Sequence, residues 1–302
     1  MHDPLVAVVI LNTNRREDTL ECLDSLAQTD SYKRQRVIVL DNASTDGSVA
    51  AIESRFPAVQ VIRLDENRGY AGNNNVGITE ALNAHAHWVL VLNEDTLLAP
   101  DCIARMVNAG EADPQIGIVG PLILHYSEPE IIQSAGGRMN VRWQAWHHLQ
   151  NAPCKAAPAT PFQVDWVSGC AIMVRRAVIE QIGMFDERFF YYWEETEWCI
   201  RAQRAGWRVL VEPAAQLWHK GVQRNYRPKP SVSYYDTRNH LLLMRKHGAP
   251  LAAWFVTTGQ KLRTIVSYSV RPKWRDRRDH RDAMIRGAID FLACRWGQGP
   301  LT

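Results

Sequence analysis

The chain has 302 residues, of which 46% are hydrophobic, enough to bury the core of one large domain or two small ones. The net charge of +3 is too small to indicate a nucleic-acid-binding protein, and no apolar run approaches the roughly 20 residues that span a bilayer. Six cysteines without CxxC spacing argue against a disulfide framework or zinc site, and the N-terminus lacks signal-peptide features, which together predict a cytoplasmic protein.

Four short apolar runs near the N-terminus each end in a polar cluster. They occupy residues 6–11, 37–40, 59–64 and 88–92. Amphipathic helical stretches separate them, which is typical of an α/β fold with a parallel sheet. Because the carboxyl ends of parallel strands open onto one crevice, we expect the four clusters to converge on a single site that binds a nucleotide-like ligand.

Later segments continue the pattern with one long interruption. Helices are predicted at 17–28, up to residue 56, at 73–84 and from residue 100, with a strand at 116–119. Residues 125–162 are rich in Pro, Gly, Trp and His and predict a functional loop or lid. Order returns at 164–167, with strands at 171–174 and 208–211, helices from 176 and at 194–205, and a further apolar segment reaching His219. Beyond residue 231 the pattern is helical.

The polar residues after the first two strands favour recognition of a pyrimidine base. The Asp41 carboxylate can accept a hydrogen bond from the imide N–H of uracil or thymine, and Thr13 and Asn14 can do similar work from the neighbouring strand. Alternatively, Asp41 and Asn42 only shape a turn. The shared edge with three other clusters favours binding.

Asn93, Glu94 and Asp95 close the fourth run and indicate a divalent-cation site. Mg²⁺ or Mn²⁺ beside a nucleoside diphosphate is commonly held by one or two carboxylates and by phosphate oxygens. Asp95 is the expected direct ligand, although it can also cap the following segment. His219 would contact the metal or diphosphate if its strand ends beside Asp95. Arg68 and Lys220 are candidate phosphate contacts, with surface solvation as the alternative.

Three acidic residues open the helix predicted at 194–205. Glu197 stands four residues before Arg201, an orientation that suits a helical ion pair. Glu194 and Glu195 emerge directly from an aromatic loop that can exclude water, so either is a candidate general base for an acceptor hydroxyl. The alternative is that both only complement the helix dipole.

These segments resemble the family 2 glycosyltransferases of GT-A fold, and among them the bacterial rhamnosyltransferase-like branch. The resemblance covers roughly the first 220 residues, in segments 6–14, 40–47, 67–77, 92–96, 166–175, 183–197 and 206–221. Residues 234–239 also resemble that branch's C-terminal extension. The resemblance implies a Rossmann-like, mostly parallel sheet flanked by helices, a nucleotide-sugar donor, a divalent metal and inversion at the anomeric carbon.

By resemblance, individual positions acquire roles. Asp41 matches the base-binding aspartate, Asp95 the last residue of the metal-binding DxD motif, and His219 the late histidine near the metal or diphosphate. Asn93 replaces the first acid of DxD. Glu195 stands where the family has its catalytic aspartate, and because glutamate is one methylene longer, the base is Glu195 or Glu194. The donor site implied in this way contains Thr13, Asn14, Asp41, Arg68, Asn93, Glu94, Ser168 and Gly169.

The aromatic residues around the acids are predicted to pack on sugar faces and close the site. They are Trp166, Phe190, Tyr191, Trp193 and the segment 143–148, with core packing as the alternative for each.

By resemblance the donor is dTDP-rhamnose, with UDP-linked hexoses left open, and the acceptor is a saccharide or lipid-linked saccharide. Rival hypotheses are a sugar nucleotidyltransferase, which needs a glycine-rich phosphate loop that residues 12–16 lack, and a non-catalytic sugar-nucleotide binding module.

The chain is expected to divide into a catalytic domain, residues 1–225, and a helical C-terminal extension, residues 226–302. Nine Lys or Arg stand against three Asp between residues 261 and 286, interleaved with aromatic side chains. This mixture suits the anionic cytoplasmic face of the inner membrane, and a homodimer contact is the equal alternative.

Overall fold

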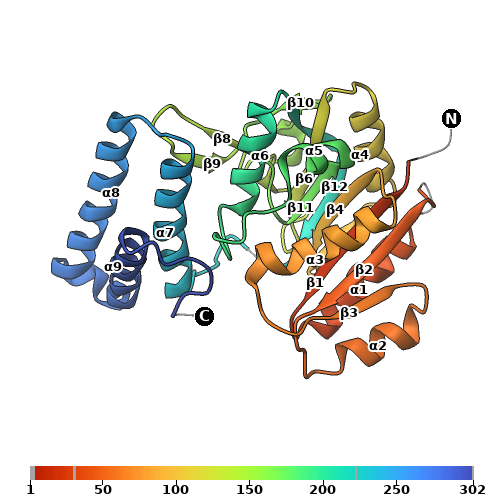
Figure 1. Cartoon of the computed structure of the whole chain (residues 1–302), viewed down its shortest axis with the longest axis horizontal. Coiled ribbons are helices and arrows are strands. Elements are labelled where there is room, and N and C mark those ends of the chain that lie inside the picture. The colour runs from red at the N-terminus through yellow and green to blue at the C-terminus, as the bar shows by residue number, and fades with distance from the viewer. Residues whose placement is uncertain (1–3, 30–31, 222, 301–302) are drawn as a thin grey trace.

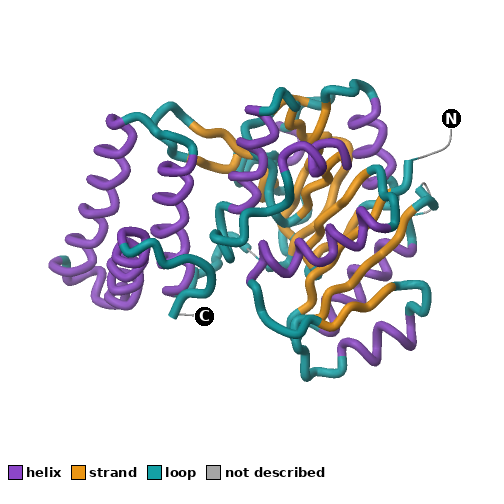
Figure 2. The backbone as a smooth tube through the Cα atoms, in the orientation of Figure 1, coloured by secondary structure: helices purple, strands orange, loops and turns teal. Residues whose placement is uncertain are grey.

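The computed structural model describes residues 4–29, 32–221 and 223–300, and its centre is one twisted sheet with helices on both faces (Figures 1 and 2). The sheet has the strand order β10-β12-β6-β11-β4-β1-β2-β3, with β5 paired to β12 and β7 to β6. The strands are β1 (Val6–Asn12), β2 (Gln35–Asp41), β3 (Gln60–Arg63), β4 (Trp88–Asn93), β5 (Thr96–Leu98), β6 (Ile116–His125), β7 (Ile132–Ser134), β10 (Phe162–Gln163), β11 (Ala171–Arg175) and β12 (Arg208–His219). The helices are α1 (Arg16–Ala27), α2 (Ser48–Arg55), α3 (Gly69–Asn83), α4 (Cys102–Glu111), α5 (Arg176–Ile182), α6 (Glu194–Arg204), α7 (Pro230–Lys246), α8 (Leu251–Val270) and α9 (Arg278–Leu292), with 3₁₀ turns η1 (Cys154–Ala156) and η2 (Pro272–Arg277).

The sheet is mostly parallel, as predicted. β1 pairs in parallel with both β2 and β4, β2 with β3, and β6 with β12. Strand β11 is antiparallel to both of its neighbours, β4 and β6. Since β11 runs backwards, its first residues lie at the edge where β1, β2 and β4 end.

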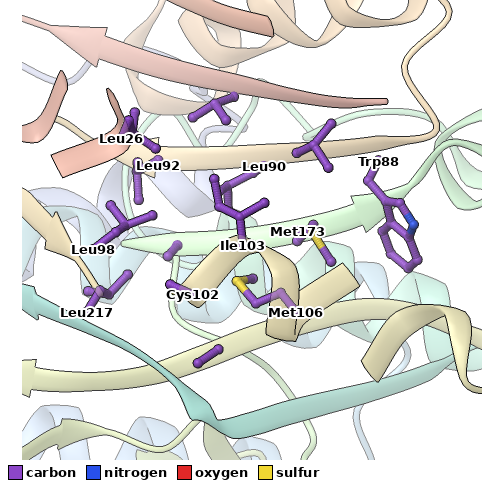
Figure 3. Packing of buried hydrophobic residues seen from close by; sticks show 14 of the residues in the cluster. Leu26, Trp88, Leu90, Leu92, Leu98, Cys102, Ile103, Met106, Met173 and Leu217 are labelled. Atoms are coloured by element: carbon purple, nitrogen blue, oxygen red, sulfur yellow. The ribbon is translucent and has the colours of Figure 1, made fainter. Parts of the chain in front are cut away.

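Alternate residues of the central strands enter two separate cores, because successive side chains of a strand point to opposite faces. Leu90 and Leu92 join helices α1 and α4 on one face, which Figure 3 shows from close by. Val89 and Val91 join α3 and α6 on the other face. A sheet that is covered on both faces explains why the strands read as nearly continuous apolar runs.

Three segments differ from the sequence prediction. The strand expected at 116–119 extends to His125 and is buried throughout. Residues 125–162, expected as a loop, contain β7 and a hairpin of β8 (Gly137–Met139) and β9 (Ala145–His147). The segments expected at 208–211 and up to His219 form one strand, β12, with a register shift between Glu212 and Gln216.

Helices α7, α8 and α9 form a layer beside the sheet (Figure 1). Its core joins Leu241, Leu242 and Leu243 of α7 to Phe291 of α9, and it includes Phe189 from the loop before α6. The C-terminal helices therefore pack directly against a segment that leads into the predicted base. Among the described residues, no helix combines the length and apolar character needed to cross a bilayer.

Candidate active site

The ends of β1, β2 and β4 place the first polar clusters at one edge. In the strand register Asn12 stands opposite Asp41, and Leu11 opposite Asn93. Asp41 is 3% exposed; its Oδ1 accepts a hydrogen bond from Asn12 Nδ2 at 2.9 Å, and its Oδ2 accepts one from Ser44 N at 3.1 Å. Each carboxylate oxygen has two lone pairs, so both can still accept a hydrogen bond from a base.

Thr13 and Asn14 are exposed and connect this edge to the turn after β2. Asn42 Nδ2 donates to Thr13 Oγ1 at 3.2 Å, and Thr45 N donates to Asn14 Oδ1 at 2.8 Å. Asn14 has a φ of 52°, a conformation that asparagine tolerates better than most residues. The two loops that flank Asp41 are thus fixed to each other.

A short antiparallel pairing brings His219 to Asp95. β5 pairs with the end of β12 so that Thr96 stands opposite His219. As a result His219 Nε2 lies 3.1 Å from Asp95 Oδ1, and both side chains are buried. The Lys220 N–H also donates to the Asp95 carbonyl at 2.9 Å. The condition set for His219 by the sequence, a strand end beside Asp95, is met.

Arg15 neutralises the acidic pair after β4. Its Nη2 lies 2.7 Å from Asp95 Oδ2, and its Nε lies 3.8 Å from Glu94 Oε1. Burial works against the charged form of Asp95, yet His219 and Arg15 hold its pKa below the ordinary value. Burial and the neighbouring Asp95 raise the pKa of Glu94 to about 7. The site therefore concentrates negative charge on Asp95.

The orientation of His219 fits a cation ligand. Its Nδ1 lies 2.8 Å from Gln133 Oε1, an acceptor, so Nδ1 carries the proton in the neutral ring and Nε2 keeps its lone pair. That lone pair faces Asp95 Oδ1, which is buried without a hydrogen bond of acceptable geometry. Two facing acceptors need a proton or a cation between them. Without a cation the proton is favoured: although burial favours the neutral ring, Cys170 and Asp95 raise the pKa of His219 well above its usual value.

The backbone after β12 closes over this pair. A side chain at Gly221 would come within 2.5 Å of Asp95 Oδ2 and 3.1 Å of His219 Nε2, so glycine leaves this pair undisturbed. Within the described part of the chain, no group of three or more His, Cys, Asp or Glu side chains is arranged to hold a metal ion by itself. Asp95 and His219 thus supply two ligands at most, and phosphate oxygens would have to complete the coordination.

The acidic pair Glu194–Glu195 lies at the same edge, beside the start of β11. Asn93 N donates to the Cys170 carbonyl at 2.9 Å, which joins the end of β4 to the segment that contains Ser168 and Gly169. A side chain at Gly169 would lie 3.7 Å from both Glu195 Cβ and the Tyr70 hydroxyl. The Tyr70 hydroxyl donates to the Gly169 carbonyl at 2.5 Å. Asp41, Asp95 and Glu195 are therefore connected by neighbouring strands at a single edge.

Glu194 and Glu195 differ in their environments. Glu194 is 4% exposed, and its Oε2 has no hydrogen-bond partner among the described residues. Burial, reinforced by the charge of Glu195, raises the pKa of Glu194 well above its ordinary range. Glu195 is only partly buried, lies 3.4 Å from the Thr196 hydroxyl, and has its pKa raised by burial. The pKa is thus raised for both carboxyls, and most clearly for Glu194, which is buried and faces the charge of Glu195.

The side chains predicted to contact sugar or phosphate differ in their exposure and in their partners. Tyr191 is 44% exposed, whereas Trp166 is 5% exposed and packs at 4.8 Å against His147 in the core. Trp193 stacks on His240 of α7, with ring centroids 4.5 Å apart. Arg68 is engaged by Glu187 through contacts of 2.6 and 2.8 Å. Of the three aromatic side chains, only Tyr191 is exposed, although its ring lies 4.3 Å from that of Tyr192.

Glu197 and Lys220 have partners in the structure. Arg201 contacts Glu197 at 2.8 Å, which confirms the predicted helical ion pair, and Lys246 and His247 add contacts at 2.8 and 3.1 Å. Lys220 pairs with Asp18 at 3.0 Å and with Glu21. Glu197 is therefore a structural anchor between α6 and α7.

A model of the family described as glycosyl transferase family 2 matches residues 7–183, more than half of the chain. The chain belongs to this family. It is 27% identical over 279 residues to an N-acetylglucosaminyl-diphospho-decaprenol L-rhamnosyltransferase of Mycobacterium tuberculosis, covering 83% of this chain and 88% of the relative. It is 24% identical over 262 residues to a dTDP-rhamnosyl transferase of Shigella flexneri, covering 83% of each.

Solved structures show the same fold. A mannosyltransferase from Pyrobaculum calidifontis, in complex with GDP-Man and Mn²⁺, matches with a TM-score of 0.56 at 18% identity over 97% of this chain and 88% of that chain. Staphylococcus aureus TarS, in complex with UDP-GlcNAc, matches with a TM-score of 0.60 at 14% identity over 97% and 84%. The protein is a glycosyltransferase of GT-A fold, and the predicted rhamnosyltransferase-like relationship is confirmed.

Several residues around this transferase's site were absent from the sequence prediction. Arg15 follows Asn14 directly, and its place after a strand end was the available signal. Gln133 lies in the segment expected to be a loop, and only the fold brings it to His219. Arg238 and Asn239 lie in a segment that resembles the family extension, but nothing in the sequence connected them to the base.

Helix α7 holds the loop that leads into the acidic pair. The Asn239 amide donates to the carbonyl oxygens of Phe189, Tyr191 and Tyr192 at 2.6, 2.8 and 2.9 Å. Arg238 donates to the carbonyls of Arg188, Phe189 and Gly297.

This loop contains three residues with a strained, left-handed backbone conformation. Phe190, Tyr192 and Trp193 have φ values of 62°, 70° and 75°, which cost about 1–3 kcal/mol each for such residues. The contacts from α7 offset this strain and fix the direction in which α6 begins. Helix α7 is thus part of the support of the loop that precedes Glu194.

Replacement of Asn239 by aspartate is expected to destabilise the transferase by about 3–5 kcal/mol. One carboxylate oxygen would keep the contact from Arg238 Nε, but the other would face three carbonyl oxygens without a proton to donate, in a site that is 0% exposed. Urea denaturation followed by circular dichroism measures the change. The same substitution at the exposed Asn108 of α4 should change stability by less than about 0.5 kcal/mol. Equal stability of the two variants would contradict the supporting role of α7.

Proposed function

We propose that this glycosyltransferase moves a sugar, with inversion, from a nucleoside diphosphate to a hydroxyl of a saccharide or lipid-linked saccharide at the cytoplasmic face of the inner membrane. The favoured donor is dTDP-rhamnose. The observation that carries the proposal is the common edge on which Asp41, the Asp95–His219 pair and Glu195 lie. Recognition of a base, of a diphosphate and of an acceptor hydroxyl would then occur side by side.

In this proposal Glu195 is the general base. Its carboxylate takes the proton from the acceptor hydroxyl while the acceptor oxygen forms a bond to the anomeric carbon. The bond from that carbon to the diphosphate oxygen breaks, and the nucleoside diphosphate leaves with the electron pair. Glu194 keeps its proton and stays neutral, since burial raises its pKa well above the usual range. One displacement without a covalent intermediate inverts the anomeric configuration.

The residues around Asp95 act on the departing diphosphate. A divalent cation held by Asp95 and His219 would supply positive charge to the leaving group when bound. Arg15, already 2.7 Å from Asp95, adds a fixed positive charge at the same place. Asp41 accepts a hydrogen bond from the pyrimidine, with Thr13 and Asn14 on its flank. Tyr191, which is 44% exposed, would pack on the sugar.

The relatives support the choice of donor and acceptor. The M. tuberculosis relative is named for transfer of L-rhamnose to a diphospho-decaprenol-linked sugar, and the S. flexneri relative for use of dTDP-rhamnose. Mn²⁺ accompanies GDP-Man in one structural neighbour, which supports a divalent metal, Mn²⁺ or Mg²⁺. The sugar-nucleotidyltransferase alternative is disfavoured by the absence of glycine from residues 12–16.

A thermal-shift panel tests the donor and the metal together. Since the protein supplies two ligands at most, Mn²⁺ alone is expected to leave the melting temperature unchanged. dTDP-rhamnose with Mn²⁺ should raise it by several degrees, more than UDP-GlcNAc or GDP-mannose, and EDTA should remove the increase. Identical shifts with and without Mn²⁺ would refute the metal assignment. No shift with any nucleotide sugar would refute the proposed function.

A further inference from the structure

Helix α8 buries very little of its length. Of its 20 residues, only Ala253 and Thr257 are buried. Its inner side contacts α7 through Lys261, whose Nζ donates to Asp236 at 3.2 Å, and α9 through the Trp254 ring, 6.0 Å from that of Phe291. Figure 1 shows α8 at the outer edge of the molecule, on the far side of α7 from the sheet.

The outward side of α8 carries a continuous apolar stripe. Its members are spaced four or seven residues apart, so they fall within an arc of roughly 100° on a helix with 3.6 residues per turn. They are Leu251, Phe255, Leu262, Val266 and Val270, with exposed fractions of 76%, 77%, 61%, 49% and 70%. Exposed apolar side chains that gather in one stripe, in contrast to scattered ones, mark an interaction surface.

The charges around the stripe have one sign. α8 contains Lys261 and Arg263 but neither Asp nor Glu, and Arg271, Lys273 and Arg275 follow before the first acid, Asp276. The last three basic side chains are exposed. Within the described part of the chain, Arg263, Arg271 and Arg275 form no ion pair, so their charges are available to an anionic partner.

We propose that the α8 stripe is the docking surface for an anionic lipid bilayer. The helix would lie in the plane of the membrane, with Phe255 and Leu262 among the acyl chains and the basic residues that follow α8 against the headgroups. Each Lys or Arg near such a surface contributes about 1 kcal/mol, and the buried apolar side chains add to this. The helix lies on the membrane and does not span it.

A second copy of this chain fits the surface less well. A symmetric dimer places the same patch on both sides of the interface. Two α8 helices would therefore bring Arg263 and the residues after α8 of one copy against basic residues of the other, without a carboxylate on either helix. Juxtaposition of like charges disfavours such an interface, whereas lipid phosphates satisfy the same charges.

The inference goes beyond the proposed function, since it predicts lipid binding whether or not the acceptor is lipid-linked. Binding to the bilayer through α8 would keep the neighbouring α7, and through it the loop before Glu194, at a fixed height above the membrane. Lipid binding and sugar transfer are measured separately, so either can fail without the other.

Vesicle flotation of the full chain tests the proposal. We expect co-flotation with vesicles of phosphatidylcholine containing about one third phosphatidylglycerol, and at least tenfold weaker binding to phosphatidylcholine alone. High salt should weaken the interaction because it screens the basic residues. The double variant Phe255→Ser/Leu262→Gln should lose at least tenfold in bound fraction and keep the melting temperature of the wild type, since both side chains are exposed.

The matched control is Val141→Ser, which removes an 86% exposed apolar side chain from the turn between β8 and β9. It should float like the wild type. Failure of the wild type to bind anionic vesicles would overturn the proposal, as would undiminished binding by the double variant. A wild-type dimer in solution that dissociates in the double variant would also overturn it, and would assign the stripe to a contact between copies.

Discussion

The substitution Glu195→Gln is expected to lower kcat by about 10³-fold while donor binding stays close to that of the wild type. Gln has the shape of Glu but cannot accept a proton at neutral pH. Glu195 is the partly exposed member of the acidic pair and lies beside Gly169 at the edge where β1, β2 and β4 end. Single-turnover rates at saturating donor measure the chemical step, and donor-induced thermal shifts measure binding.

The pH dependence gives the same assignment an independent readout. As the proposed base, Glu195 would have to be deprotonated to act, and burial raises its pKa above the ordinary 4.5. Activity should therefore rise with pH through an apparent pKa above 4.5, so the acid limb lies at higher pH than for an exposed glutamate. The limb should disappear in Glu195→Gln, whose residual rate has no base to titrate.

Glu194→Gln provides the matched control, because it removes the neighbouring carboxylate and keeps Glu195. We expect a loss in kcat of about tenfold or less. This variant also changes stability in a predictable direction. A carboxyl whose pKa is raised on folding stabilises the fold below pH 4.5, and that contribution is lost as pH rises through the raised pKa. Glu194→Gln should thus melt at a higher temperature than the wild type at pH 8 and show little difference at pH 4.

A larger loss of kcat in Glu194→Gln than in Glu195→Gln would reassign the base. If Glu194→Gln lost about 10³-fold and Glu195→Gln stayed near wild type, Glu194 would be the proton acceptor in spite of its burial. Comparable losses in both variants would mean that the two carboxyls act as one titrating unit.

The sequence predicted the parts of this architecture that depend on local pattern. Apolar runs with polar ends, separated by amphipathic stretches, were sufficient to predict the sheet and the edge that carries Asp41 and Asn93. The central strands β1 and β4 are buried on both faces, so their periodicity and length are encoded within a few residues. The Glu197–Arg201 pair was predictable for the same reason, since four residues along a helix fix the contact.

What could not be predicted depends on contacts between distant segments. Asp95 meets His219 only because β5 pairs with the end of β12, and a three-residue strand leaves almost no signal in sequence. Gln133 reaches His219 from a segment whose hairpins are short and rich in Gly and Trp. Trp166 was predicted to pack on a sugar face, with core packing as the alternative, and only the tertiary structure shows that it lies in the core.

The choice between the two glutamates was beyond the sequence for a different reason. Adjacent residues at a helix start look equivalent in sequence, whereas their pKa values depend on burial. Burial here is set by the strained aromatic loop, and that loop is held by Arg238 and Asn239 from a helix more than 40 residues later. The chemistry of the pair is therefore a property of the tertiary structure.

Asp95→Asn is expected to lower kcat/KM by about 10³-fold and to remove the Mn²⁺-dependent part of the thermal shift produced by a nucleotide sugar. Asn keeps the size of Asp, but it removes the charge that faces both His219 and Arg15. Without this charge the site would lose one of the two proposed cation ligands. The variant should fold, because the backbone hydrogen bond from Lys220 to residue 95 is unaffected.

Two further variants separate the loss of a metal ligand from other effects of the substitution. Asp113→Asn also removes an ion-paired carboxylate, 2.7 Å from Arg208, but at the opposite edge of the sheet, and should transfer sugar like the wild type. Arg15→Gln breaks the ion pair with Asp95 while it leaves both carboxylate oxygens in place. It should weaken donor binding and yet keep the dependence on Mn²⁺. If Arg15→Gln also lost that dependence, or Asp95→Asn retained it, the ion pair would explain the phenotype and the metal would have to bind elsewhere.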